Sequence, residues 1–334
     1  MDKRLLDTFE KHKDEYLQHL KNLVAIDTQD IGHGILGGRE KEGQEYLEKL
    51  FKEMGADEII IDPMKEEIIE RAKREYNEGN LGHNYEDRYN LIAKFKGDPN
   101  GRTLLFNGHI DTMPPGDLSK WDEDPFKPYI KDGKLYGLGT ADMKSGLMAS
   151  IMAVKLLKDA GYELPGDVTI VSVVDEEGGG NGSIQAVLNG YTADGAVICE
   201  PSEGHIIVAH MGFVFFEVKV KGIALHSGYK WKGVNAIEKA IKLIEALNEM
   251  EHNWLMKYKH PLLPPPTLNV GVIEGGTAGS TVPDSCTFKL CLHYLPKVMN
   301  YEQVVEEVID TINTRAKGDP WLKDNMPEIS IYQA

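Results

Sequence analysis

Residues 103–112 read TLLFNGHIDT, and this stretch decides the fold. Its apolar run from Leu104 to Phe106 is typical of a strand buried on both faces of a sheet, and polar residues follow directly. The stretch DVTIVSVVDEE at residues 167–177 repeats that pattern, and a helical pattern from Met143 to Ala160 separates the two. Strands that alternate with long helices predict an α/β domain with three layers and a mostly parallel sheet.

The pattern changes after Pro201, where strands begin to alternate apolar with polar residues. The order strand, helix, strand, strand, helix predicts an inserted α+β domain of the ferredoxin-like kind, with one solvated sheet face. We expect residues 1–206 to form the first domain and residues 207–321 the inserted one, with residues 322–334 starting a segment that returns to the first domain. The elements expected in the insertion are strands 206–221, 266–273 and 286–294 and helices 234–258 and 301–316.

Composition excludes several classes of protein. Lys and Arg number 37 against 53 Asp and Glu, a net charge of −16, which repels the phosphates of nucleic acid. The N-terminus, MDKRLLDTFEKHKDEY, is too charged for a secretory signal, and no apolar run of about 18 residues predicts a membrane span. We therefore expect a cytoplasmic protein. Three scattered cysteines fit neither a disulfide framework nor a cysteine-rich zinc site.

Histidine and carboxylate side chains follow the predicted strands. His109 and Asp111 are two residues apart and so share one face of a strand end, where Asp111 can brace an imidazole that binds a metal. An ordinary turn histidine is the alternative for His109. Asp142 precedes a helical run, so Asp142 can be a helix N-cap, a metal ligand or both.

Two further acidic groups follow apolar strands. Three carboxylates, Asp175, Glu176 and Glu177, precede three glycines, and Glu200 follows the apolar run GAVIC. An acidic surface loop is the alternative, but adjacent carboxylates after a buried strand are costly unless a cation neutralises them. Ligands bind at the carboxyl ends of strands in open α/β sheets, so these groups predict a site for divalent metal ions. Imidazole and carboxylate ligands suit zinc, manganese or cobalt.

Eight motifs carry a resemblance to a known family. The chain resembles the co-catalytic zinc amidohydrolases that include acetylornithine deacetylase, succinyl-diaminopimelate desuccinylase, carboxypeptidase G and aminoacylase. The resemblance implies a catalytic first domain and a second domain that acts as a lid and forms a homodimer. The motifs are LLFNGHIDTMPPG, WDEDPF, GKLYGLGTADMKSGL, DEEGGGNGS, CEPSE, GIALHSG, LNVGVIEGG and TVPD.

The resemblance also implies the roles of individual residues. His109, Asp142 and Glu200 would hold one ion and Asp142 and Glu177 the other, with zinc preferred over cobalt or manganese. Glu176 would be the general base. Two residues complete the set: Asp111 would orient His109, and His226 would reach across the dimer to stabilise the oxyanion.

Three departures from the family pattern affect the second ion and the substrate. The family takes a further histidine ligand from a segment near its C-terminus, and this sequence ends at Ala334 before such a residue. A substrate-binding arginine of the family aligns with Cys291 and His293, and an asparagine with Ser280. Histidine lacks the bidentate fork with which arginine binds a carboxylate.

Three functions therefore remain open. The first is hydrolysis of an N-acyl amino acid or a related small amide by metal-activated water. The second keeps this chemistry but acts on dipeptides. The third is an inactive truncated fragment or a regulatory binding protein, which the expected loss of the C-terminal histidine favours and the intact Glu176, Glu177 and Glu200 oppose.

Overall fold

The computed structural model describes residues 2–333. Its contacts divide the chain into two compact units, with the boundary between His205 and Ile206. The sequence placed this boundary one residue later. We call the part up to His205 the first unit and the part from Ile206 the second unit.

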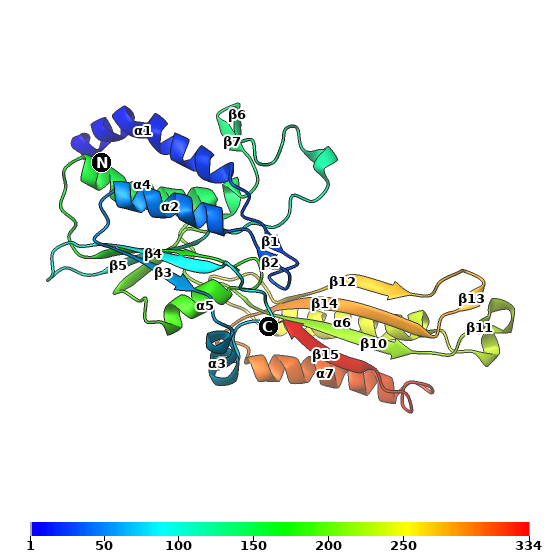
Figure 1. Cartoon of the computed structure of the whole chain (residues 1–334). Coiled ribbons are helices and arrows are strands. Elements are labelled where there is room, and N and C mark those ends of the chain that lie inside the picture. Colours follow the sequence, from blue (N-terminus) through cyan, green and yellow to red (C-terminus); the bar gives the residue numbers. More distant parts are fainter. Residues whose placement is uncertain (1, 334) are drawn as a thin grey trace. The chain divides into compact units, whose positions relative to one another are not determined.

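A five-stranded mixed sheet forms the centre of the first unit (Figure 1). Its order is β3-β4-β8-β5-β9, in which β5 runs parallel to both β8 and β9. The strand β4 is antiparallel to both β3 and β8, so four strands share one direction and β4 alone opposes them. The sheet strands are β3 (Glu58–Pro63), β4 (Tyr89–Phe95), β5 (Leu104–His109), β8 (Val168–Val173) and β9 (Gly195–Ile198).

Helices cover both faces of this sheet, which confirms the three-layer α/β fold. Alternate residues of β4 enter different cores: Leu91 and Ala93 pack with α2 and α4 residues, whereas Ile92 packs with Ala186 of α5. Figure 1 shows α1, α2 and α4 on one side and α5 on the other. The helices are α1 (Lys3–Val24), α2 (Lys41–Glu53), α3 (Glu66–Tyr76), α4 (Ser145–Asp159) and α5 (Asn181–Leu188), with short turns η1 (Leu118–Lys120) and η2 (Thr140–Lys144).

Two short hairpins complete the first unit. They pair β1 with β2 and β6 with β7. The bounds are β1 (Asp30–Ile31), β2 (Gly37–Gly38), β6 (Tyr129–Lys131) and β7 (Lys134–Tyr136).

The second unit has a four-stranded antiparallel sheet in the order β12-β14-β10-β15. Along the chain the elements run β10, α6, β12, β14, α7, β15, which is the ferredoxin-like arrangement. One sheet face is apolar, because Val214, Phe216 and Val218 of β10 are fully buried, and the helices pack on it. The elements are β10 (Gly212–Lys221), β11 (Leu225–His226), η3 (Ser227–Lys232), α6 (Ala236–Lys257), β12 (Thr267–Gly275), β13 (Thr281–Val282), β14 (Ser285–Tyr294), α7 (Tyr301–Lys317) and β15 (Glu328–Gln333).

The last strand corrects one prediction. Residues 322–334 were expected to start a return into the first unit, but β15 pairs with β10, placing Ile329 opposite Val218 and Ile331 opposite Phe216. Without β15, β10 would have an unpaired edge, which sheets normally avoid. The closing segment therefore supplies the fourth strand of the second unit.

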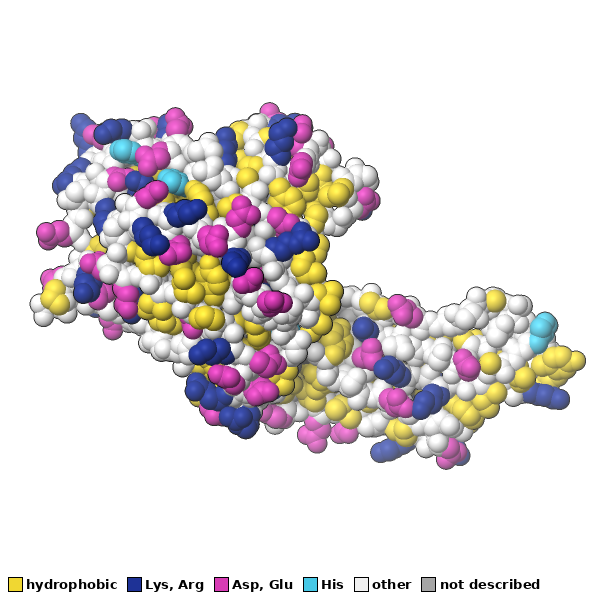
Figure 2. Space-filling view, in the orientation of Figure 1, with side chains coloured by type: hydrophobic (Ala, Val, Ile, Leu, Met, Phe, Trp, Pro, Cys, Tyr) yellow, Lys and Arg dark blue, Asp and Glu magenta, His cyan; other side chains and the backbone are white. Residues whose placement is uncertain are grey.

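Charged side chains of both signs lie interspersed over the face shown in Figure 2. Within residues 2–333, no helix is long and apolar enough to cross a membrane.

Candidate metal centre

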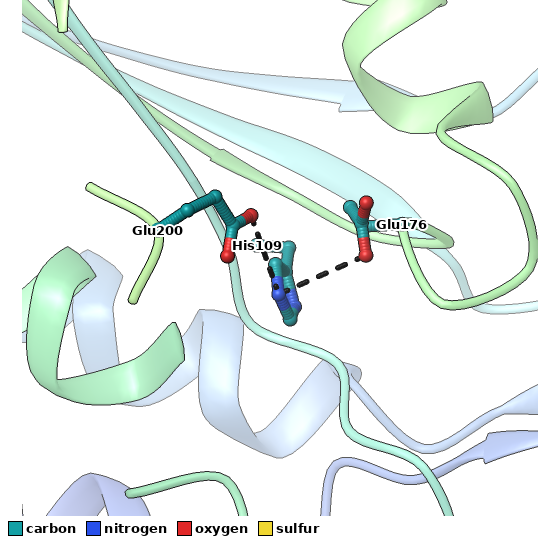
Figure 3. A group of neighbouring side chains, drawn as sticks. All are labelled: His109, Glu176 and Glu200. Atoms are coloured by element: carbon teal, nitrogen blue, oxygen red, sulfur yellow. Dashed lines mark ion pairs between the residues drawn. The ribbon is translucent and has the colours of Figure 1, made fainter. Parts of the chain in front are cut away.

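The carboxyl ends of three parallel strands bring the predicted residues together in the first unit. His109 is the last residue of β5, Glu176 follows β8, and Glu200 follows β9. The His109 Nε2 atom lies 3.8 Å from Glu176 Oε2 and 3.7 Å from Glu200 Oε1 (Figure 3). The turn η2 adds Asp142, whose Oδ1 lies 3.0 Å from the same nitrogen. The imidazole is thus the centre of a ring of carboxylates.

Two overlapping groups in this ring have the geometry of a metal site. His109, Glu176 and Glu200 form one group, and His109, Asp142 and Glu177 form the other. In each group, the potential ligand atoms all lie within 4.8 Å of one another. All five side chains that the sequence singled out for metal or base chemistry in this unit therefore share one place.

Asp111 supports both His109 and the loop that carries the glutamates. Its backbone carbonyl lies 2.9 Å from His109 Nδ1, closer than its carboxylate Oδ1, which lies 3.6 Å from that nitrogen. Asp111 Oδ2 accepts a hydrogen bond of 2.9 Å from the backbone N–H of Glu177. Asp111 is fully buried. Asp111 thus lies beside His109, its role in orienting the imidazole stays a prediction, and its contact with Glu177 was not foreseen.

The electrostatics of the ring favour a bound cation. Burial is the main cause that raises the pKa of Glu177 to about 7; the attraction of His109 opposes it, and the nearby carboxylates Asp142 and Asp111 add to it. Burial and the same kind of crowding raise the pKa of Glu200 to about 7. Burial by itself would lower the pKa of His109, but the Asp142 hydrogen bond and the surrounding carboxylates raise it to about 10.

The donor set fits divalent metal ions of the zinc, manganese or cobalt type. It offers one imidazole nitrogen and several carboxylate oxygens, which are the ligands these ions accept. The side chains of Asp142, Glu176 and Glu200 are 58%, 42% and 40% exposed, whereas His109 is 1% exposed. The carboxylates are therefore open to solvent, and the imidazole that they surround is buried.

A buried lysine anchors the turn that presents Asp142. Lys144 is fully buried, and its Nζ donates to the carbonyl oxygens of Leu23 at 3.1 Å and Ile26 at 2.9 Å. Those carbonyls lie at the C-terminal end of α1, where a cation is favourable. Burial lowers the pKa of Lys144 to about 7.

One group of buried residues near the site was missed by the sequence analysis. The segment 63–88 is rich in charged residues and contains the helix α3, in which Ile69 and Ala72 are buried. Arg88, however, is 2% exposed and forms ion pairs with Asp30, Glu40 and Asp175. No pattern in a charged segment separates a buried arginine from exposed ones. The three acidic partners of Arg88 come from other segments of the chain, so its burial becomes evident only in the folded structure.

His226 lies in the second unit, on β11, where it is exposed. Its Nδ1 accepts a hydrogen bond of 3.1 Å from the backbone N–H of Gly228. Its predicted action across a dimer stays a prediction. In the same unit Cys291 Sγ lies 3.6 Å from His293 Nε2.

Comparisons with known proteins match most of the chain to one family. Residues 105–330 match the model of peptidase family M20/M25/M40. The chain is 31% identical over 333 residues to the N-formyl-4-amino-5-aminomethyl-2-methylpyrimidine deformylase of Bacillus subtilis, covering 95% of this chain and 72% of that protein. It is 36% identical over 215 residues to acetylornithine deacetylase of Pasteurella multocida, covering 64% of this chain and 55% of that protein.

Solved structures share the fold. The dipeptidase Dug1p of Saccharomyces cerevisiae superposes with a TM-score of 0.67 at 16% identity, covering 99% of this chain and 79% of that one. The aminopeptidase PepT of Bacillus cereus superposes with a TM-score of 0.63 at 23% identity, covering 96% and 75%. The family match and the long deformylase alignment confirm the resemblance found in the sequence: the chain belongs to peptidase family M20/M25/M40 and is a metal-dependent amidohydrolase.

Proposed function

We propose that this protein hydrolyses the amide bond of an N-acyl amino acid or a related small N-acyl compound. The observation that carries the proposal is the gathering of one histidine and four carboxylates from separate segments at one sheet edge. Carboxylates that lie close together repel one another. Their convergence on a buried imidazole is therefore unfavourable unless a bound cation compensates for the repulsion.

Two divalent ions, preferably zinc, with cobalt or manganese as alternatives, would occupy the ring. His109, Asp142 and Glu200 would hold one, and Asp142 and Glu177 the other. When bound, the ions supply a Lewis acid that polarises the amide carbonyl and makes water nucleophilic.

Glu176 is the general base in this proposal. Its Oε2 lies 3.8 Å from His109 Nε2, so its carboxylate borders the ring while its side chain stays partly open to solvent. The carboxylate takes a proton from the attacking water and passes it to the nitrogen of the leaving amine, which breaks the C–N bond. Asp111 keeps the His109 ring in place from the buried side.

The second unit contributes His226 in this proposal. The exposed imidazole donates a hydrogen bond to the oxyanion that develops on the carbonyl oxygen. A homodimer formed through the second unit would bring the partner copy's histidine to the site, so this role predicts a homodimer. Such a dimer is testable by sedimentation.

A small N-acyl amide is preferred as the substrate because the deformylase alignment covers nearly the whole chain. The Proteus mirabilis acetylornithine deacetylase is also similar, at 32% identity over 236 residues. A dipeptide is the second candidate, because the fold superposes on a dipeptidase with a TM-score of 0.67. The two substrates require the same hydrolysis of an amide bond and differ in the groups on either side of that bond.

The test is hydrolysis by the purified chain after removal of metal with a chelator. N-formyl amines, N-acetyl amino acids and dipeptides would be compared, before and after addition of zinc, cobalt or manganese. We expect activity only with metal, highest on an N-acyl compound, and lost in Glu176→Gln. Equal activity with and without metal would refute the proposal, and a preference for dipeptides would select the second candidate.

A further inference from the structure

The guanidinium of Arg88 joins three carboxylates inside the first unit. Its Nη1 lies 2.9 Å from Asp175 Oδ1, and its Nη2 lies 3.0 Å from Asp30 Oδ2. Its Nε donates to both carboxylate oxygens of Glu40, at 3.0 and 3.2 Å. All four side chains are at most 1% exposed. A single guanidinium charge therefore forms ion pairs with three buried carboxylates.

Stability alone does not account for this network. Burial raises the pKa of Asp30 to about 6 and that of Glu40 to about 7, since neighbouring carboxylates oppose the attraction of Arg88. Buried ion pairs are often no more stabilising than apolar side chains of similar volume. The burial of so many charges is unfavourable, and it is better explained if the network holds other residues in position.

Asp175 connects the network to the metal centre. It directly precedes Glu176 and Glu177, and its carbonyl accepts a hydrogen bond of 3.0 Å from the Gly180 N–H, which closes the turn. Its second carboxylate oxygen lies 2.8 Å from Nδ1 of His83, whose side chain is 3% exposed. Both carboxylate oxygens of Asp175 are thus held by cations or ring N–H groups.

Packing leaves Asp175 no alternative position. Its φ is 61°, a left-handed conformation that is uncommon for residues other than glycine. A Cβ atom at Gly34 would lie 2.4 Å from Asp175 Oδ1, and one at Gly178 would lie 2.5 Å from it. Only glycine fits at these two positions, so the backbone on both sides closes tightly around the carboxylate.

The same guanidinium holds a loop next to Glu177. Asp30 accepts a hydrogen bond of 2.5 Å from the Gly34 N–H, which fixes the hairpin of β1 and β2. The preceding residue, His33, has its Nδ1 3.2 Å from the Glu177 carbonyl oxygen. Arg88 therefore reaches the Glu177 backbone by two routes, through Asp175 and through Asp30.

We propose that Arg88 is a positioning residue that acts through Asp175 to fix Glu176 and Glu177 at the metal centre, with His83 as a second support. The proposal rests on the proposed function, because it assigns the network to the placing of the base and a ligand. Residues behind metal ligands typically change metal affinity or activity 10- to 100-fold when they are replaced.

The main experiment is a double-mutant cycle on the full chain with Arg88→Met and Asp175→Asn. Zinc affinity would be measured by competition with a chromophoric chelator, and kcat and KM at saturating zinc. We expect each variant to weaken zinc binding and lower kcat by about 10- to 100-fold, with KM changed less than about 2-fold. Because Arg88 acts mainly through Asp175, while His83 also supports Asp175, the loss in the double variant should be clearly smaller than the product of the two single losses.

Two controls separate positioning from general destabilisation. Phe51→Leu opens the apolar core of the same unit, where Phe51 is fully buried and its ring packs edge-on against Phe95. It should lower the unfolding temperature without changing zinc affinity or kcat. If Arg88→Met does not fold, His83→Leu replaces it, and His83→Gln, which restores an N–H donor, should recover part of the loss.

A readout without metal keeps the inference separate from the proposed function. In the metal-free protein, Arg88→Met should speed hydrogen–deuterium exchange in the peptide spanning residues 175–180, whereas Phe51→Leu should leave that peptide unchanged. This result would stand even if the wild type hydrolysed none of the amides. Multiplicative losses in the cycle, unchanged exchange and zinc affinity in folded Arg88→Met, or equal losses in Phe51→Leu would each overturn the inference.

Discussion

The two units differ in what they bury. Sixteen of the seventeen buried polar or charged side chains among the described residues lie in the first unit, and the second unit has only Asp319. Both units have extensive apolar cores. Buried charge is thus concentrated where the candidate metal centre lies, and the second unit is built almost entirely from apolar packing.

This difference separates residues that maintain the fold from residues that position chemistry. A compact α+β unit can be stabilised mainly by apolar burial, as the second unit illustrates with Phe216, Phe288 and Trp254. The first unit instead holds Arg88, His109 and Lys144 in its interior. Natural proteins depart from simple packing rules mainly at functional sites.

The largest expected effect is on catalysis in the first unit. Glu176→Gln should lower kcat by about 10²–10⁴-fold, because the amide has no basic oxygen to take the proton. Its zinc content and unfolding temperature should match those of the wild type, since the side chain is 42% exposed. Steady-state kinetics and metal analysis of the wild type and the variant measure both quantities. If Glu176→Gln had the turnover and the zinc content of the wild type, Glu176 would not be the general base.

The next effect should be purely structural and confined to the second unit. Phe216→Ala removes a fully buried ring from β10 and should cost about 3–5 kcal/mol of unfolding free energy. Urea denaturation gives that value. Zinc affinity of the folded variant should not change, because no candidate ligand lies in this core. A weakened zinc affinity would show that the core of the second unit also affects the metal centre, contrary to this comparison of the units.

Among the described residues of the second unit, the buried charge of Asp319 should have a smaller and pH-dependent effect. Burial would raise the pKa of Asp319, but hydrogen bonds from Lys239 at 2.7 Å and Lys242 at 2.9 Å hold it well below its usual range. The ionised carboxylate therefore stabilises the fold above about pH 4, the unfolded pKa, and this stability is lost as the pH falls through the folded pKa.

Asp319→Asn should accordingly lose about 2 kcal/mol at pH 7. The difference from the wild type should shrink as the pH falls below about 4. Urea denaturation of both proteins at pH 7 and pH 3 measures it. A difference that grows toward acid pH would show that the carboxylate is not held in its ionised form.

The sequence predicts the metal centre better than its supports. Strand ends follow from apolar runs that stop at polar residues, so His109, Asp142 and Glu200 were found from pattern and motif. Arg88 and His83 were missed because a charged loop carries no periodicity that marks a buried residue. Their burial depends on Asp30 and Asp175, which only the folded chain brings near.

Two features of the fold also escaped the sequence. An alternating strand such as MPEISIY fits any half-buried sheet edge, so its pattern does not reveal that β15 pairs with β10. Likewise, the apolar run of β4 has no feature that marks its direction, although β4 opposes the other strands. Pairing depends on the edges that the rest of the chain leaves open.

The central claim is that side chains from separate strand ends share bound metal. It is tested most directly by the zinc-to-protein ratio of the wild-type chain and of Glu200→Ala after chelation and reloading. We expect bound zinc in the wild type and a clear loss in the variant at the same free zinc concentration, with an unchanged circular dichroism spectrum. An equal ratio in both proteins, or no bound zinc in the wild type, would contradict it.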